Sequence, residues 1–276
     1  MNWKTIFTIA KKDIKEAVQN KSVWLPILIV PLIFVVLLPL GMIIAFGSSL
    51  GAANNPLNDP DIANFMQKMP AFMSDSIQGM NGVQSGIVLM LGYLFAPFFL
   101  ILPLMFSTVI ASESFAGERE RKTIEALLYT PATDAELFLG KALAGLIPAV
   151  SITWGSFIAY ILVVNGAAHP VMGRIWFPLP TWYPLMLWVS PAVSLLGIAF
   201  TVLISAKTQT FMGAYQSSAS LVVLILGLIA GQATGILYLS VTVGILMGVV
   251  IFAVDGVLMY YAVRTFNRDK LLASAN

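Results

Sequence analysis

Residues 23–46 read VWLPILIVPLIFVVLLPLGMIIAF, a run that contains no aspartate, glutamate, lysine or arginine. A helix needs about 20 apolar residues to cross a hydrocarbon core about 30 Å thick. The run is long enough for one crossing, and it is far longer than the apolar region of about 7–15 residues in a cleavable signal peptide. It therefore predicts a membrane-spanning helix rather than a leader.

The rest of the chain has the same character. Further stretches without charged residues cover 76–112, 142–173, 175–206, 208–254 and 256–263. The stretch 208–254 is too long for a single crossing, and its segment Gly231–Gly235 has the composition of a tight turn. We therefore expect an all-α integral membrane protein with six transmembrane helices, near residues 23–46, 85–111, 138–164, 184–205, 211–230 and 236–263.

The overall composition excludes several classes of protein. Of the 276 residues, 58% are hydrophobic and only 10% are charged, and the mean hydropathy is +0.88. A soluble domain carries about 25% charged residues, so a soluble enzyme, a disordered chain and a nucleic-acid binder are excluded. The absence of cysteine excludes disulfides, thiolate metal sites and thiol catalysis.

The basic residues predict the orientation of the spans. Thirteen of the fifteen lysines and arginines fall in the two terminal segments or in the loops on the same side as them, and only Lys68 and Arg174 fall on the other side. Cytoplasmic loops carry the excess of basic residues. We therefore expect a multi-pass protein of the cell membrane with both termini in the cytoplasm.

Two segments outside the spans have amphipathic patterns. Residues 3–18 combine apolar residues at helical spacing with four lysines, which predicts an interfacial helix within a segment 1–22. This helix is either a plain anchor or also touches a cytoplasmic partner. The outer loop 47–83 contains a helix-start signal at Asp59-Pro60 and an apolar face that runs to Met73. It is either a short helix resting on the membrane or a lid over a pathway.

The loop between spans two and three is the most informative segment. It reads SESFAGERERKTIEALLYTPATDAELFLGK over 112–141 and holds ten of the chain's twenty-eight charged residues. Ile124, Leu127 and Leu128 form an apolar edge on a charged helix expected over 117–129. Pro131 ends that helix, and Thr133 with Glu136 makes a capping box for the next span. The charges of this loop either serve only to keep it soluble or belong to a docking helix. The defined ends of the segment favour the docking helix.

This segment resembles the signature of the permease (transmembrane) subunits of ABC-2-type ABC transporters. In that family a glutamate-rich run is followed by Thr-Ile-Glu or Thr-Leu-Glu, a leucine pair, Thr-Pro and Leu-Gly-Lys. The matching residues here are Glu118, Glu120, Thr123, Ile124, Glu125, Leu127, Leu128, Thr130, Pro131, Leu139, Gly140 and Lys141. The amphipathic start, the six spans and the tail are also similar to that family, and the large outer loop is similar to its sodium- and drug-export permeases.

The resemblance implies a six-span permease domain over 23–264, followed by a cytoplasmic tail over 265–276. It also implies an exporter in which cytosolic ABC ATPase subunits bind the ATP, and a second permease, either an identical copy or a sister chain. The segment 117–129 would be the coupling helix that docks on the ATPase. Its implied coupling residues are Glu118, Arg119, Glu120, Arg121, Thr123, Ile124, Glu125, Leu127 and Leu128.

No catalytic, cofactor or metal site is expected within the chain. Gly140-Lys141 is followed by Ala142, and residue 135 is alanine, so the spaced glycine and the Ser/Thr of a phosphate-binding loop are missing. The single histidine, His169, is expected in an outer loop. ATP is therefore expected to bind to a partner rather than to this chain.

Asp255 is the one acidic residue within an expected span. A charge in the bilayer is costly, so such a residue suggests a function. Two interpretations remain open: a structural pair or hydrogen bond, for example with Arg264, and a gating role for ions or substrate. The main alternative to an ABC permease is an ATP-independent channel or ion-coupled secondary transporter, and a third class is a membrane scaffold or sensor. The substrate cannot be identified from the sequence.

Small and aromatic residues suggest further packing. Glycines recur every four residues at 227, 231 and 235 and at 244 and 248. Such spacing lets helices approach closely, and we expect these glycines either to pack span five against span six or to serve the dimer seam. Trp176, Trp182 and Tyr183 are expected to form an aromatic belt at the outer interface.

Overall fold

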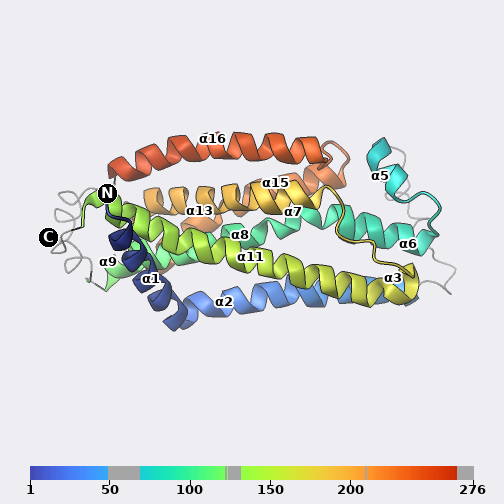
Figure 1. Cartoon of the computed structure of the whole chain (residues 1–276), viewed down its shortest axis with the longest axis horizontal. Coiled ribbons are helices and arrows are strands. Elements are labelled where there is room, and N and C mark those ends of the chain that lie inside the picture. The colour runs from blue at the N-terminus through green and yellow to red at the C-terminus, as the bar shows by residue number, and fades with distance from the viewer. Residues whose placement is uncertain (49–68, 122, 124–131, 209, 266–276) are drawn as a thin grey trace.

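The structure is a computed structural model that describes residues 1–48, 69–121, 123, 132–208 and 210–265. Within these residues six helical segments are long and apolar enough to span a membrane, which confirms the expected all-α membrane fold. They run side by side as an elongated bundle (Figure 1). We call the end where α1 begins and α16 finishes the termini end, and the opposite end the distal end.

The chain is built from the following helices. The termini-end helix α1 is Trp3–Gln19, and span one joins α2 (Lys21–Pro31), η1 (Leu32–Leu37) and α3 (Leu38–Ser48). Two short distal pieces follow, α5 (Ala71–Ser76) and α6 with η4 (Gly82–Ile87, Val88–Leu94). Span two joins α7 (Ala96–Phe99), α8 (Ile101–Ser112), η5 (Glu113–Gly117) and α9 (Glu118–Glu120). Span three is α11 (Asp134–Met172), and span four joins α12 (Trp182–Pro184), η6 (Leu185–Val189) and α13 (Ser190–Ser205). Span five joins α14 (Phe211–Ala219) and α15 (Val222–Ala233), and span six is α16 (Val241–Thr265).

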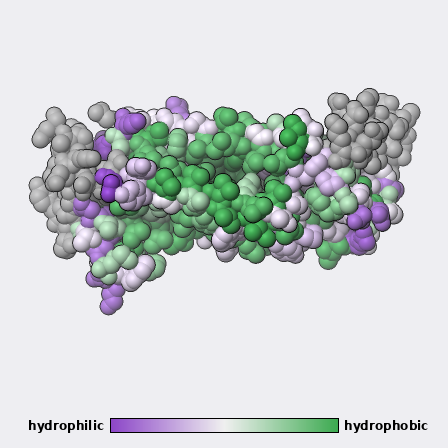
Figure 2. All heavy atoms as spheres, turned by 90° about the horizontal axis from the view of Figure 1, so that it is seen from above, coloured by the Kyte–Doolittle hydropathy of each residue, from purple (hydrophilic) through white to green (hydrophobic). Residues whose placement is uncertain are grey.

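Span two forms the centre of the bundle. In its most apolar stretch 83% of the residues are buried, against 56% for span four and 17% for each of spans one, five and six. Hydrophobic residues cover the middle of the molecule, and hydrophilic residues gather towards its two ends (Figure 2). The outer spans therefore expose apolar side chains over the height of a bilayer, while spans two and four supply the protein core.

Aromatic residues fill the core at the distal end. Trp182 is fully buried, stacks on Phe157 and Tyr160, and donates its Nε1–H to the Gly92 carbonyl at 2.6 Å. The expectation that Trp182 belongs to an interfacial belt is therefore wrong. A buried tryptophan needs an acceptor for its N–H, and the backbone of η4 provides one.

Span three is longer than the sequence indicated. α11 continues past the predicted end at residue 164 and stops at Met172, where Gly173 adopts the left-handed conformation with φ 66°. His169 and Pro170 lie inside its last turns rather than in a loop. At about 1.5 Å per residue, the helix is long enough to extend beyond the hydrocarbon core.

Span six packs on span four. A Cβ added to Gly244 would lie 3.2 Å from Pro184, and one added to Gly248 would lie 2.1 Å from Trp188. These two glycines therefore allow span six to approach span four closely. The expectation that they pack span six on span five is wrong. Positions 244 and 248 of span six face positions 184 and 188 of span four. The two spans therefore run parallel, with the same difference in residue number between facing positions.

The expected outer loop is described only in part. Asp59-Pro60 lies outside the described residues. Met73 lies on α5 and is 1% exposed within the main hydrophobic cluster of the bundle. The described part of this segment is thus anchored on the folded distal end.

Candidate functional site

At the termini end of the bundle, α1 packs against α11. Ile6 and Ile9 of α1 are buried, and a Cβ added to Gly140 would lie 2.8 Å from the Cβ of Ile9 and 3.1 Å from the backbone oxygen of Ile6. Glycine at 140 therefore lets the backbones of the two helices approach closely. Asn2 fixes the start of α1, since its N–H donates to the carboxylate of Glu136 at 2.6 Å.

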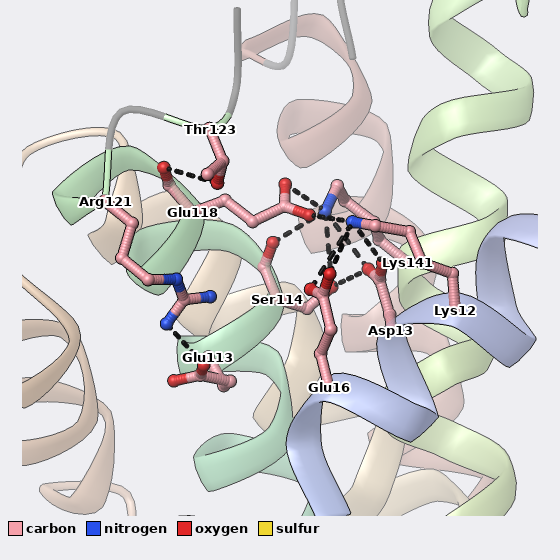
Figure 3. A network of polar contacts seen from close by, with 9 residues as sticks. All are labelled: Lys12, Asp13, Glu16, Glu113, Ser114, Glu118, Arg121, Thr123 and Lys141. Atoms are coloured by element: carbon pink, nitrogen blue, oxygen red, sulfur yellow. Dashed lines mark hydrogen bonds and ion pairs between the residues drawn. The ribbon is translucent and has the colours of Figure 1, made fainter. Parts of the chain in front are cut away.

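The next residue, Lys141, is a buried lysine at the centre of a polar network (Figure 3). Its ammonium lies 2.6 Å from Oε2 of Glu118, 3.1 Å from Oδ2 of Asp13 and 2.7 Å from the backbone oxygen of Ser114. The Ser114 hydroxyl donates to Asp13. All three side-chain partners are buried. A buried charge is costly unless it is paired and hydrogen-bonded, and here Lys141 and the two carboxylates satisfy one another.

Lys12 extends this network to the surface. Its ammonium lies 2.7 Å from Glu118, 3.3 Å from Glu16 and 3.4 Å from Asp13, so these three carboxylates converge on a lysine. Burial lowers the pKa of Lys12, but the hydrogen bond and charge of Glu118 outweigh burial and raise that pKa above its ordinary value of 10.5. Lys12 therefore contributes its full ion-pair stability below pH 10.5, and this contribution is lost as the pH rises through the raised pKa.

A further ion pair at the end of span two also binds the corner between α1 and span one. The buried carboxylate of Glu113 accepts from Arg121 at 2.7 Å and from the side chain of Asn20 at 3.0 Å. Asn20 also caps α2, because its Oδ1 accepts from the N–H of Ser22 at 3.0 Å. The start of span one is thus tied to the end of span two.

Residues Arg119 and Glu120 connect the end of span two to spans four and five. Arg119 donates to the backbone oxygen of Ser205, the last residue of α13, at 2.7 Å, and Glu120 accepts from the backbone N–H of Phe211, the first residue of α14, at 2.7 Å. A cation at a helix C-terminus and an anion at an N-terminus both match the helix dipole. We call the three consecutive residues 118–120 the triplet. Glu118 joins the end of span two to α1 and α11, Arg119 joins it to α13, and Glu120 joins it to α14.

The structure changes part of the prediction for 117–129. Residues 117–120 are the last turn of span two rather than the start of a separate helix, because no helix breaker separates them from α8 and the chain leaves the helical conformation only at Arg121. Glu118 is 1% exposed and is neutralised by Lys12 and Lys141, so it is not a rim charge facing a partner. Thr123 donates its hydroxyl to the backbone oxygen of Glu118 at 3.2 Å and closes this end.

The apolar edge of the expected docking segment and Glu125 lie outside the described residues. These positions are Ile124, Glu125, Leu127 and Leu128. Their role as a docking helix stays a prediction.

Sequence reasoning missed Asp13 and the charge partners of Lys141. One signal for Asp13 was available: it lies in phase with Ile6, Ile9 and Ala17, on the face of α1 that is buried. An acidic residue on an apolar face indicates a buried charge that needs a partner. No local pattern identifies Lys141 as that partner, since the two residues are 128 positions apart in the chain.

Asp255 is buried in α16, with 3% of its surface exposed, and neither carboxylate oxygen has a hydrogen-bond partner in the described part of the chain. Arg264 instead lies over the ring of Tyr260, 4.4 Å from its centre. The suggested pair between Asp255 and Arg264 is therefore wrong. The offset set by Gly244 and Gly248 places Asp255 level with residue 195 of α13, inside the bundle rather than on the lipid face.

The sequence profile of the family described as ABC-2 family transporter protein matches residues 7–267. The chain belongs to the ABC-2 transporter family. The match covers α1 from its fifth residue, all six spans and the network around Lys141, so the resemblance noted in the 112–141 segment is confirmed over almost the whole chain. A comparison with curated proteins finds no match. As an ABC-2 family member with six apolar helices, the protein is a multi-pass transmembrane permease.

Proposed function

We propose that this permease is the membrane-spanning subunit of an ATP-driven exporter of the cell membrane. In this proposal both termini are cytoplasmic, cytosolic ATPase subunits bind and hydrolyse ATP, and two permeases, identical or sister chains, form the translocation path. The family match and the excess of basic residues at the termini end support it.

The observation that carries the proposal is the triplet at the end of span two. Glu118, Arg119 and Glu120 contact different elements through hydrogen bonds of 2.6–2.7 Å, and these elements belong to α1 and to spans three, four and five. The residues that follow the triplet make up the rest of the expected docking segment 117–129. A displacement applied to that segment would therefore act on several spans together.

Two properties make this arrangement suited to coupling. Charge-assisted hydrogen bonds are about twice as strong as neutral ones and fix the orientation of the groups they join. Glu118 is in addition buried, which makes the rupture of its bonds to Lys12 and Lys141 costly. The triplet would consequently move as a unit with the ends of its partner helices, and ATPase closure would tilt spans rather than deform a loop.

The test is the docking of the ATPase on the segment after the triplet. Leu128→Asp should bury an unpaired charge in that contact and cost about 3–5 kcal/mol, which is more than a hundredfold in affinity. We expect the ATPase to be lost from a pull-down with the tagged permease, while the variant permease still inserts and elutes as the unaltered protein does on size exclusion.

Glu125→Ala serves as the graded control. A rim charge contributes less to affinity than a buried apolar anchor, so this variant should keep most of the ATPase. Equal recovery of the ATPase with Leu128→Asp and with the unaltered permease would refute docking at this segment.

A second candidate function rests on Asp255. Its carboxylate is buried in a membrane helix and has no hydrogen-bond partner among the described residues, a feature expected of an ATP-independent channel or an ion-coupled secondary transporter. The candidate predicts proton or sodium flux into liposomes that contain the purified chain alone.

Asp255→Asn separates the two candidates, because it keeps the side-chain shape and removes the charge. For an ATP-driven permease we expect no flux without the ATPase from either protein, and an unfolding temperature of the variant at or above that of the unaltered chain, since the cost of a buried charge is removed. Ion-sensitive dyes inside the liposomes measure the flux. A flux that disappears in the variant would favour the second candidate.

A further inference from the structure

A cavity of about 220 Å3 opens at the distal end, between α5, the start of η4 and the loop that joins α11 to α12. Met80, Val88 and Leu179 give it an apolar lining, and Ser76, Arg174 and Trp176 supply its polar groups. Pockets that enclose a drug-sized ligand measure about 300–1,000 Å3. The size therefore suits one compact group rather than a whole large ligand.

The loop that forms one wall is held in place by the protein. Asn165 of α11 accepts from the backbone N–H groups of Trp176 and Phe177 at 3.0 and 3.2 Å, and it donates to the Phe177 oxygen at 2.7 Å. A Cβ on Gly92 would lie 2.6 Å from Leu179 and 3.2 Å from Trp176, so glycine there lets the loop pack directly on η4. The cavity is thus preformed.

The cavity offers hydrogen-bond donors without internal acceptors. Arg174 is exposed and makes no ion pair with the described residues, and the Nε1 of Trp176 is buried without an acceptor among them. A guanidinium fits the oxygens of a phosphate or carboxylate through two parallel hydrogen bonds. A buried indole N–H also requires an acceptor, so the cavity has the chemistry of a small oxyanion site.

The position of the cavity and its lining distinguish between possible anions. Val88 lies on η4, which precedes the start of span two at Ala96, so the cavity lies beside the distal ends of the spans. Ile175, beside Arg174, is 80% exposed. An exposed isoleucine next to a cation fits contact with both an acyl chain and a headgroup.

We propose that this cavity binds the phosphate of a phospholipid in the distal leaflet, with Arg174 as its principal ligand and Trp176 Nε1 as a second donor. The two sources of such a phosphate are a bilayer lipid and a water-soluble phosphorylated solute, and the apolar lining and the exposed Ile175 beside the ends of the spans favour the lipid. The site does not depend on ATP or on a partner, and so it stands apart from the proposed coupling to an ATPase.

The experiment measures lipid retention by native mass spectrometry of the full chain in a neutral detergent, with phosphatidylglycerol as the probe. Arg174→Gln should weaken binding about tenfold, because a charge-assisted hydrogen bond is lost. Trp176→Phe keeps the ring and should weaken binding about threefold through loss of the N–H. Lys15→Gln, at an exposed lysine of α1, is the matched control for charge and should bind as the unaltered protein does.

Two further ligands identify the source of the phosphate. Diacylglycerol with the same chains lacks the phosphate, so its binding should not respond to Arg174→Gln. Glycerol 3-phosphate lacks the chains and should bind at least about tenfold more weakly than the lipid. Equal lipid binding by Arg174→Gln and the unaltered protein would overturn the site, and equal affinity for glycerol 3-phosphate and the lipid would overturn the lipid assignment.

Discussion

Lys141→Met should destabilise the permease by about 3–5 kcal/mol, because it leaves the buried carboxylates of Asp13 and Glu118 without their central counter-charge. Methionine has a similar length and keeps most of the packing, so the loss reports charge rather than volume. For a chain of this size the unfolding temperature should fall by roughly 6–20 °C. Thermal unfolding in detergent, followed by circular dichroism, measures the change.

Two variants show that the loss comes from the network. Lys15→Met removes an exposed lysine of α1 and should change stability by less than about 0.5 kcal/mol. The triple variant Asp13→Asn, Glu118→Gln, Lys141→Met replaces all three buried charges by neutral groups, and it should recover more than half of the loss. A triple variant as unstable as Lys141→Met alone would show that packing around Lys141, and not charge, determines the stability.

Much of the fold could be predicted from the sequence because composition encodes membrane spans directly. Each apolar run without charges became a helix, since every backbone group in lipid must be satisfied within a helix. Boundaries were less certain. Span three continued through His169 and Pro170, because the actual stop is the left-handed Gly173 and not the proline.

The face that each span buries could not be predicted. A span that is apolar all round carries no periodic signal for its protein-facing side. Trp182 was therefore assigned to the interface although it is in the core, and Gly244 and Gly248 were assigned to span five although they contact span four.

The site was predicted only in part, for a different reason. The charged residues at 118–121 are part of the predicted coupling segment, but three of their partners, Lys12, Ser205 and Phe211, lie 86 or more positions away in the chain. Only the folded chain brings them together. The family signature Leu139-Gly140-Lys141 also gains a physical meaning: glycine admits α1, and the lysine after it neutralises the acids that α1 and span two bury.

Gly140→Ala should detach α1 from α11, although alanine is the better helix former by about 0.8–1.0 kcal/mol. The added methyl would lie 2.8 Å from the Cβ of Ile9 and 3.1 Å from the backbone oxygen of Ile6, neither of which is the flexible end of a side chain. α1 must therefore shift as a whole. We expect a net loss of about 1–3 kcal/mol, the usual cost of overpacking, and a weakened bond between Asp13 and Lys141 one turn away.

Gly155→Ala, in the same helix, is the matched control. Apart from the backbone of its own helix, no atom of the described residues lies within 4 Å of its added Cβ, so the better helix propensity should appear as equal or greater stability. Trypsin provides a readout specific to α1, which carries four lysines at 4, 11, 12 and 15. Cleavage at these sites should accelerate in Gly140→Ala and stay unchanged in Gly155→Ala, at temperatures well below global unfolding. If both variants were cleaved at the rate of the unaltered protein, the close contact at Gly140 would not be what holds α1 on the bundle.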